Sequence, residues 1–204
     1  DSGDNTTAGA PGDHTTVLQA LLARNDAPDV VVPGILAPAL VKRAIAAGPG
    51  AEIEVELGAE HISTPESRMM VTGRIEACGP ELVLGGFQPY RSAEGGWAKI
   101  RFGSVIATFH DLPIGITTPT HFEAMGIDPI GHAVYVVKLG YLHPQLEDIA
   151  ARHILLLTDG TVSLDLPGRS WKYLSRPIYP LEDDAGWTPD RGLYLSAPAE
   201  PVTA

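Results

Sequence analysis

Helix and strand patterns alternate in the first third of the chain. Apolar side chains recur at helical spacing after Asp13 and again after Pro38, and proline is favoured in the first turn of a helix. Either Asp13 or Thr15 is expected to cap the first helix. Between the two helices stands a wholly apolar run, residues 30–32, which is typical of a strand covered on both faces. The buried positions expected in the helices are Val17, Leu18, Leu21 and Leu22, then Leu40, Val41, Ala44 and Ile45.

The middle of the chain has the patterns of β-strands. Over residues 52–57, glutamates alternate strictly with Ile53, Val55 and Leu57, which predicts a strand with one face in water. Apolar runs separated by glycine and proline predict further strands along the chain. These strands are expected over residues 69–78, 97–102, 104–109, 114–118, 132–138 and 154–157. Two short helices are expected over residues 121–125 and 144–152.

These elements predict an α/β fold, a single mixed α/β domain with a β-rich middle, over residues 1–182. From Asp183 onward the composition turns to proline, glycine, alanine and aspartate, so an extended tail is expected over residues 183–204. Every apolar run is shorter than the ~18 residues that indicate a membrane-spanning helix. A protein that spans a membrane is therefore not expected.

The chain is acidic. Its 204 residues include 14 Lys and Arg against 25 Asp and Glu, a formal net charge of −11. Nucleic acids and anionic membrane surfaces are bound through lysine and arginine, so neither is an expected partner. Cys78 is the single cysteine, which excludes an internal disulfide and a cysteine-rich zinc site. The chain begins at Asp1 without a signal peptide, so we expect a cytoplasmic piece of a longer protein.

Residues 1–13 form the densest polar segment. Asp1, Asp4, Asn5 and Asp13 lie in a glycine-rich loop that runs into the N-terminus of a helix. Backbone N–H groups and the helix dipole can hold an anionic group there, while the carboxylates can hold a cation or an amine. The loop has neither of the glycine patterns that bind nucleotides. The alternative is a structural loop in which Asp13 caps the helix while Asp4 and Asn5 form turns.

A second polar group follows one of the expected strands. Lys138 stands at the end of an apolar run, and Tyr141 and His143 come shortly after it. Because the sites of α/β folds collect at strand ends, these side chains can face a cleft. The alternative is a lysine that leaves the core for water. The seven histidines of the chain form no local zinc motif.

Six short motifs, taken in order, resemble the C-terminal domain of the microcystinase C-like (MlrC-like) metallopeptidases. The opening loop is similar to the Asp-x-x-Asp-Asn…Gly-Asp motif of that family, and the Val-Val-Lys segment ending at Lys138 also matches. The motifs lie at residues 1–13, 47–51, 57–58, 126–129, 136–142 and 176–181, so the resemblance covers residues 1–182. Two positions depart from the family pattern, because Ala37 replaces an aspartate of many relatives and Pro49 replaces a small apolar residue.

This resemblance implies a two-domain zinc metallopeptidase, a hydrolase of small peptides. A larger N-terminal domain would carry the zinc on histidine and carboxylate ligands, so this chain would hold no metal of its own. The present chain would pack on that domain, wall the cleft and be inactive alone. The candidate catalytic residues are Asp4, Asn5 and Lys138. The expected substrate-binding residues are Asp1, Asp4, Asn5, Gly9, Asp13, Lys138 and Tyr141.

Two other functions stay open. The chain can be a non-catalytic interaction module that docks on a partner chain through exposed leucine, valine and aromatic side chains. It can also be a self-sufficient hydrolase whose own metal is held by histidines that the fold brings together. The histidines considered for that site are His14, His110, His121 and His143. Self-association into a homo-oligomer is also left open.

Overall fold

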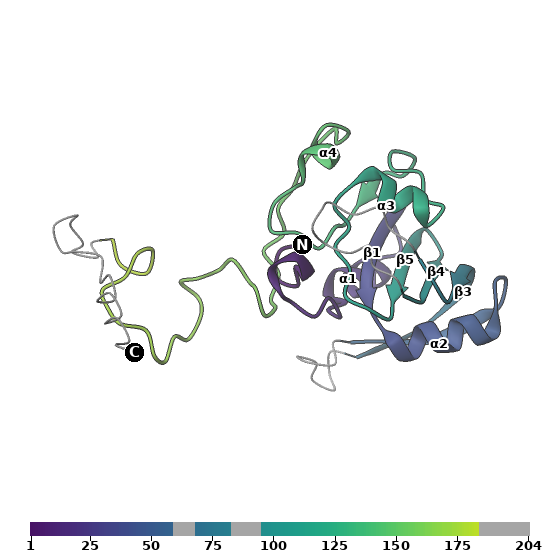
Figure 1. The fold of residues 1–204 in the computed structure, drawn as a ribbon, viewed down its shortest axis with the longest axis horizontal. Helices are drawn as coiled ribbons and strands as arrows, with labels where there is room; N and C mark the ends of the chain where they lie inside the picture. The colour runs from purple at the N-terminus through teal and green to yellow at the C-terminus, as the bar shows by residue number, and fades with distance from the viewer. Residues whose placement is uncertain (59–67, 83–94, 184–204) are drawn as a thin grey trace, which may run out of the picture. The chain divides into compact units, whose positions relative to one another are not determined.

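A six-stranded mixed sheet lies at the centre of residues 1–164 (Figure 1). The structure is a computed structural model that describes residues 1–58, 68–82 and 95–183. It divides the chain into two compact units, residues 1–164 and residues 165–204. The strands are β1 (Val30–Leu36), β2 (Glu52–Leu57), β3 (Met69–Gly79), β4 (Trp97–Phe102), β5 (Val105–His110) and β6 (Val134–Tyr135). The helices are η1 (Thr6–Ala8), α1 (Thr16–Leu22), α2 (Pro38–Ala47), α3 (Pro119–Ala124) and α4 (Pro144–Glu147).

The sheet combines an antiparallel part with a parallel part, in the order β2-β3-β4-β5-β1-β6. Strands β2 to β5 pair antiparallel with their neighbours along the chain. Strand β1 enters between β5 and β6 and pairs parallel with both, so that Val30 stands opposite Val105 and Val134. The predicted mixed α/β fold is confirmed.

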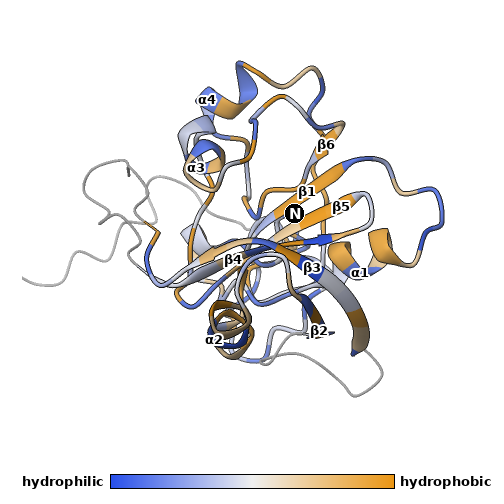
Figure 2. Ribbon diagram, turned by 90° about the vertical axis from the view of Figure 1, so that its right-hand side faces the viewer, coloured by the Kyte–Doolittle hydropathy of each residue, from blue (hydrophilic) through white to orange (hydrophobic). Residues whose placement is uncertain are grey.

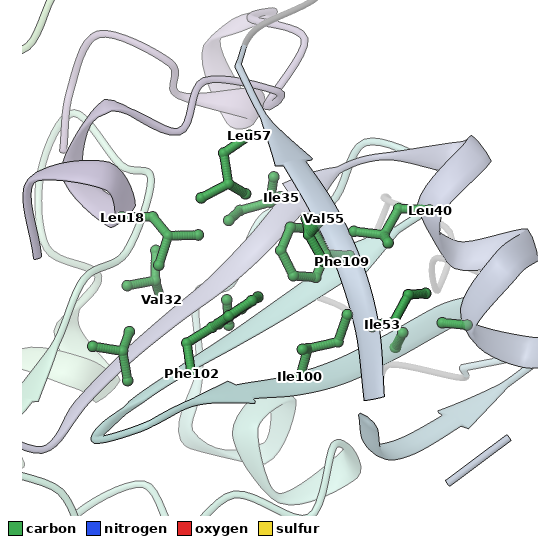
Figure 3. Close-up of a cluster of buried hydrophobic side chains, with 14 of the residues drawn as sticks. Leu18, Val32, Ile35, Leu40, Ile53, Val55, Leu57, Ile100, Phe102 and Phe109 are labelled. Atoms are coloured by element: carbon green, nitrogen blue, oxygen red, sulfur yellow. The ribbon is translucent and has the colours of Figure 1, made fainter. Parts of the chain in front are cut away.

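The two faces of β1 are covered by different helices (Figure 2). Val32 packs in one core cluster with Leu18 of α1 and Leu40 of α2 (Figure 3). Val31 points to the opposite face, where it packs in a second cluster with Phe122 of α3. Val30, Val31 and Val32 are at most 2% exposed. The wholly apolar run therefore predicted a strand that is covered on both faces, as found.

The alternation of β2 and the starts of the first two helices follow the sequence pattern. The three glutamates of β2 are exposed, while Ile53, Val55 and Leu57 are buried. Helix α2 begins at Pro38, as expected. Thr15 occupies the N-cap position of α1, although its side chain makes no capping hydrogen bond. The spacing of apolar residues therefore predicted the positions of α1 and α2, whereas the capping hydrogen bond expected for α1 is not formed by Thr15.

Residues 114–118 do not form the predicted strand. Ile114 and Ile116 are buried, but the segment packs over β1 instead of pairing beside a strand. Its carbonyl at Ile114 accepts a hydrogen bond from the Thr6 hydroxyl at 2.8 Å, and Gly34 leaves room for both isoleucine side chains. Burial alone produced the apolar pattern here, so the prediction was wrong.

The predictions for residues 132–157 were only partly right. The expected strand over 132–138 is reduced to β6, and the helix expected to reach Arg152 ends at Glu147. Beyond Glu147 the turn has no buried apolar stripe to stabilise it, since Ile149 is 40% exposed. Residues 154–157 are not a strand among the described residues, because no neighbouring strand pairs with them.

Residues 165–183 of the second unit contain no helix or strand. Local hydrogen bonds join Trp171 Nε1 to Leu166 O at 2.9 Å and Leu181 N to Ile178 O at 3.0 Å. After Asp183 the expected tail lies outside the described residues. Among the helices that are described, none has the length and apolar character needed to cross a membrane.

Candidate functional site

The polar loop of residues 1–13 lies at the carboxyl end of the parallel strands. Gly12 O accepts a hydrogen bond from Leu36 N at the end of β1 (2.9 Å). Asp1 N donates to Val137 O, just after β6 (3.1 Å). Binding sites of open α/β sheets gather at this end of the strands. The fold therefore brings together the two polar segments that the sequence placed far apart.

Asp4 and Lys138 form a buried ion pair at this point. Their side chains are 1% and 4% exposed, and Lys138 Nζ donates to Asp4 Oδ2 at 2.6 Å. Lys138 Nζ also donates to His14 O at 2.6 Å. Asp4 Oδ1 accepts from Gly12 N (2.9 Å), and Asp4 Oδ2 also accepts from His14 N (2.8 Å). The pair thus holds both ends of the loop on the segment that follows β6.

Burial dominates the electrostatics of the lysine. Removal from water disfavours the charged ammonium and lowers the pKa of Lys138. The carboxylates of Asp4 and Asp13 act in the opposite direction and offset part of this effect. Asp13 is itself 4% exposed, so three ionisable groups share one buried region. The arrangement gives a fixed, charged anchor under the loop.

Asn5 and Gly9 shape the turn that follows Asp4. Asn5 Oδ1 accepts hydrogen bonds from Thr7 N (2.9 Å) and Thr7 Oγ1 (2.7 Å) and so caps η1. Gly9 ends η1 with φ +93°, a left-handed conformation that favours glycine. The alternative considered from the sequence, in which Asn5 forms a turn, is the role observed for Asn5 Oδ1. Asn5 is 6% exposed, and its amide nitrogen lies against Gly140.

Asp1 lies beside the buried cluster, and Tyr141 lies outside it. The Asp1 carboxylate accepts a hydrogen bond from the Thr158 hydroxyl. Tyr141 is 72% exposed. Thr158 was absent from the sequence-based site, and so were the backbone groups of Gly12 and His14 that bind the ion pair. Backbone groups carry no residue signature, and Thr158 has no motif around it, so sequence reasoning had no signal for them.

The residues of the chain do not fit a metal ion at this site. The Asp4 carboxylate already accepts hydrogen bonds from Gly12 N, His14 N and Lys138 Nζ, which occupy three of its roughly four acceptor positions and leave it poorly placed as a metal ligand. In residues 1–58, 68–82 and 95–183, no group of three His, Cys, Asp or Glu side chains is placed to hold a metal.

Two of the histidines considered as metal ligands, His110 and His121, form hydrogen bonds within the fold. His110 Nε2 lies 2.8 Å from Thr108 Oγ1, and that oxygen accepts from Gly34 N at 3.1 Å. The Thr108 and His110 side chains are therefore joined by a buried hydrogen bond, and burial lowers the pKa of His110 to about 4. His121 Nδ1 accepts from Thr117 N at 3.1 Å, at the start of α3.

A small pocket lies beside His110 at the end of β5. It encloses about 180 Å³, including solvent at its mouth, and is lined by Leu82, Gly95, Gly96, His110, Asp111, Leu112 and Ile114. Pockets that bind small ligands usually measure about 300–1,000 Å³. This pocket by itself is too small for a peptide substrate.

Comparisons with known proteins agree with the fold. Residues 1–172 match the family described as MlrC C-terminus. The chain is also similar to the crystal structure of a "Putative metallopeptidase from Mesorhizobium sp. BNC1", with a TM-score of 0.71 and 22% identity. That match covers 89% of this chain but only 37% of the other, so the chain spans little more than a third of its neighbour's length. Among curated proteins, none matches.

Proposed function

The chain belongs to the MlrC C-terminus family, and from that premise we propose that it is the C-terminal domain of a zinc metallopeptidase. In this proposal it packs on an N-terminal domain that holds the zinc and walls the cleft that binds a small peptide. The chain alone is inactive. The similarity to a protein named as a metallopeptidase supports the reaction class, and the chain's coverage of 37% of that protein leaves room for a further domain.

The buried Asp4–Lys138 pair is the observation that carries the proposal. It fixes the family's opening loop at the carboxyl end of the parallel strands, where α/β folds place their sites. Three hydrogen bonds to the Asp4 carboxylate make this position rigid. Catalytic and binding groups need to be held within about 0.5 Å of their productive geometry by the residues that support them. Asp4 and Lys138 would therefore act as positioning residues, with Asn5 shaping the adjoining turn.

The test compares two substitutions in the longer, metal-loaded protein. Asp4→Asn removes the charge of the anchor, so kcat on a small peptide should fall by about tenfold or more, because small misplacements of a site are costly. Asp26→Asn is the matched control, since Asp26 forms an exposed ion pair with Arg24. Circular dichroism checks that both variants are folded. Unchanged kinetics for a folded Asp4→Asn variant would remove the positioning role.

A non-catalytic docking module is the second candidate. Apolar side chains exposed over residues 154–157 favour it, because they offer a surface for a partner chain. Both candidates need docking, so binding does not separate them. Peptide hydrolysis by the longer protein separates the two candidates. Turnover that depends on the metal supports the peptidase. A folded, metal-loaded protein without turnover supports the docking module.

A further inference from the structure

Residues 154–157, which we name the apolar strip, are exposed although every side chain is apolar. Ile154, Leu155, Leu156 and Leu157 are 65%, 46%, 38% and 62% exposed. Neighbouring side chains of an extended segment point to opposite faces. Exposure of all four therefore means that no part of the chain that the structure describes covers either face of the apolar strip.

Residues 30–32 of β1 are another run of consecutive apolar residues, and they show how such a run is normally covered. Val30, Val31 and Val32 are equally apolar and at most 2% exposed, because helices cover both faces of β1. A run without alternation is typical of a strand buried on both faces. The apolar strip has the same composition, but residues 1–58, 68–82 and 95–183 provide no such cover for it. Its pattern fits a strand within a larger assembly.

The backbone of the apolar strip is also unpaired along one edge. Ser2 N and Ser2 Oγ both donate to Leu156 O at 3.0 Å, so the start of the chain lies along one side. Within residues 1–58, 68–82 and 95–183, no group accepts a hydrogen bond from the N–H groups of residues 154–157. An extended edge with unpaired backbone groups readily accepts another strand.

Close backbone packing fixes the start of the chain against this region. Gly3 N donates to Thr158 Oγ1 at 3.0 Å. A Cβ atom on Gly3 would lie 2.5 Å from Asp159 O and 2.7 Å from Thr158 Oγ1. A Cβ on Gly160 would likewise overlap the backbone of Gly3. The two segments approach so closely that only glycine fits, and Asp1 is held beside the apolar strip.

We propose that the apolar strip is the docking edge for the polypeptide that precedes Asp1 in the longer protein, which adds a strand to it and covers its faces. This rests on the proposed function, which places a further domain there. Any residue before Asp1 leaves the fold next to the apolar strip, so its effective concentration at this edge is high. A second copy of the chain is disfavoured, since a net charge of −11 opposes self-association.

Amide hydrogen exchange tests this assignment. In the 204-residue chain the N–H groups of residues 154–157 should exchange rapidly, and in the longer protein they should exchange at least about 100-fold more slowly. Equally rapid exchange in both proteins overturns the proposal. Protection in the 204-residue chain that grows with its concentration also overturns it, because the occupant is then a second copy.

A matched pair of substitutions separates docking from folding. Leu157→Asp should leave the melting temperature of the 204-residue chain unchanged, and in the longer protein it should abolish the protection of the apolar strip. Ile130→Asp, at a residue 69% exposed elsewhere in the same unit, should leave that protection intact. Equal protection in both variants overturns the proposal. Neither the melting temperature nor amide exchange needs metal or substrate. If the apolar strip is protected in the longer protein but that protein hydrolyses no peptide, the proposed peptidase activity is refuted and the docking proposal stands.

Discussion

Asp4 and Lys138 are separated by 134 residues in the chain and by 2.6 Å in the fold, between Oδ2 and Nζ. Both side chains are buried. The carboxylate has three donors and the ammonium has two acceptors, so the pair is well satisfied. Such a pair fixes the position of a loop more than it adds net stability.

Breaking the pair from one side should be costly. Lys138→Met leaves the Asp4 carboxylate buried without its counter-charge, and we expect a loss of about 3–5 kcal/mol in the free energy of unfolding. Urea denaturation of the 204-residue chain measures it. Removal of the exposed Asp26 carboxylate should cost less than about 1 kcal/mol.

The double variant tests whether the two side chains act as one unit. Asp4→Asn combined with Lys138→Met removes both charges, so its cost should be smaller than the sum of the two single costs by more than about 1 kcal/mol. Strictly additive costs would show that the 2.6 Å contact contributes nothing.

His110 should make the protein less stable in acid. Burial lowers its pKa from 6.5 to about 4, so between these values the unfolded chain binds a proton that the folded protein does not. Stability is therefore full above pH 6.5 and falls as the pH drops to 4, by up to about 3 kcal/mol. Urea denaturation at several pH values measures this slope.

The His110→Gln variant provides the control for that slope. Its side-chain amide can donate a hydrogen bond to the Thr108 hydroxyl or accept one from it, but it does not titrate. The variant should lose less stability than the wild type between pH 6.5 and 4. Parallel pH profiles for the two proteins would contradict the assignment.

Gly3 should tolerate no side chain. Gly3→Ala places a methyl group against the backbone oxygens of Thr158 and Asp159, and we expect a loss of more than about 2 kcal/mol. Gly9→Ala is the comparison, because its surroundings are open and only its φ of +93° opposes alanine. That strain costs about 1–2 kcal/mol. Thermal unfolding measures both, and a larger loss at Gly9 would refute the steric argument.

Metal should be absent from the isolated chain. Hydrogen bonds occupy most of the Asp4 carboxylate, and the described residues contain no group of three metal-binding side chains. Elemental mass spectrometry of the chain, purified without chelator, should find less than about a tenth of a zinc per chain, and chelator should leave its melting temperature unchanged. A content of close to one tightly held metal ion per chain would contradict this prediction and indicate a site formed by the candidate histidines.

Sequence patterns predicted β1 and β2 well, and the partners of their apolar faces lie within the chain. The alternation of β2 and the apolar run of residues 30–32 each have their cover in α1, α2 or the neighbouring strands. The apolar run of residues 154–157 has the same pattern, but it is exposed and pairs with no strand among the described residues.

Sequence motifs indicated side chains that the fold brings together, but they gave no information about the contacts of those side chains. The family motifs pointed to Asp4, Asn5 and Lys138, and the fold brings all three to one end of the sheet. The partners of the pair include the backbone of Gly12 and His14, which any residue type provides. Those contacts arise from long-range packing, and local spacing cannot encode them.

The place of β1 between β5 and β6 has a consequence for synthesis on the ribosome. Val30 pairs with Val105 and Val134, partners that are translated 75 (105 − 30) and 104 (134 − 30) residues later. The antiparallel neighbours β2 to β5 can pair as they emerge from the ribosome, whereas β1 acquires both of its neighbours only after β6 has been translated. Until then its apolar faces need a chaperone or remain open to aggregation.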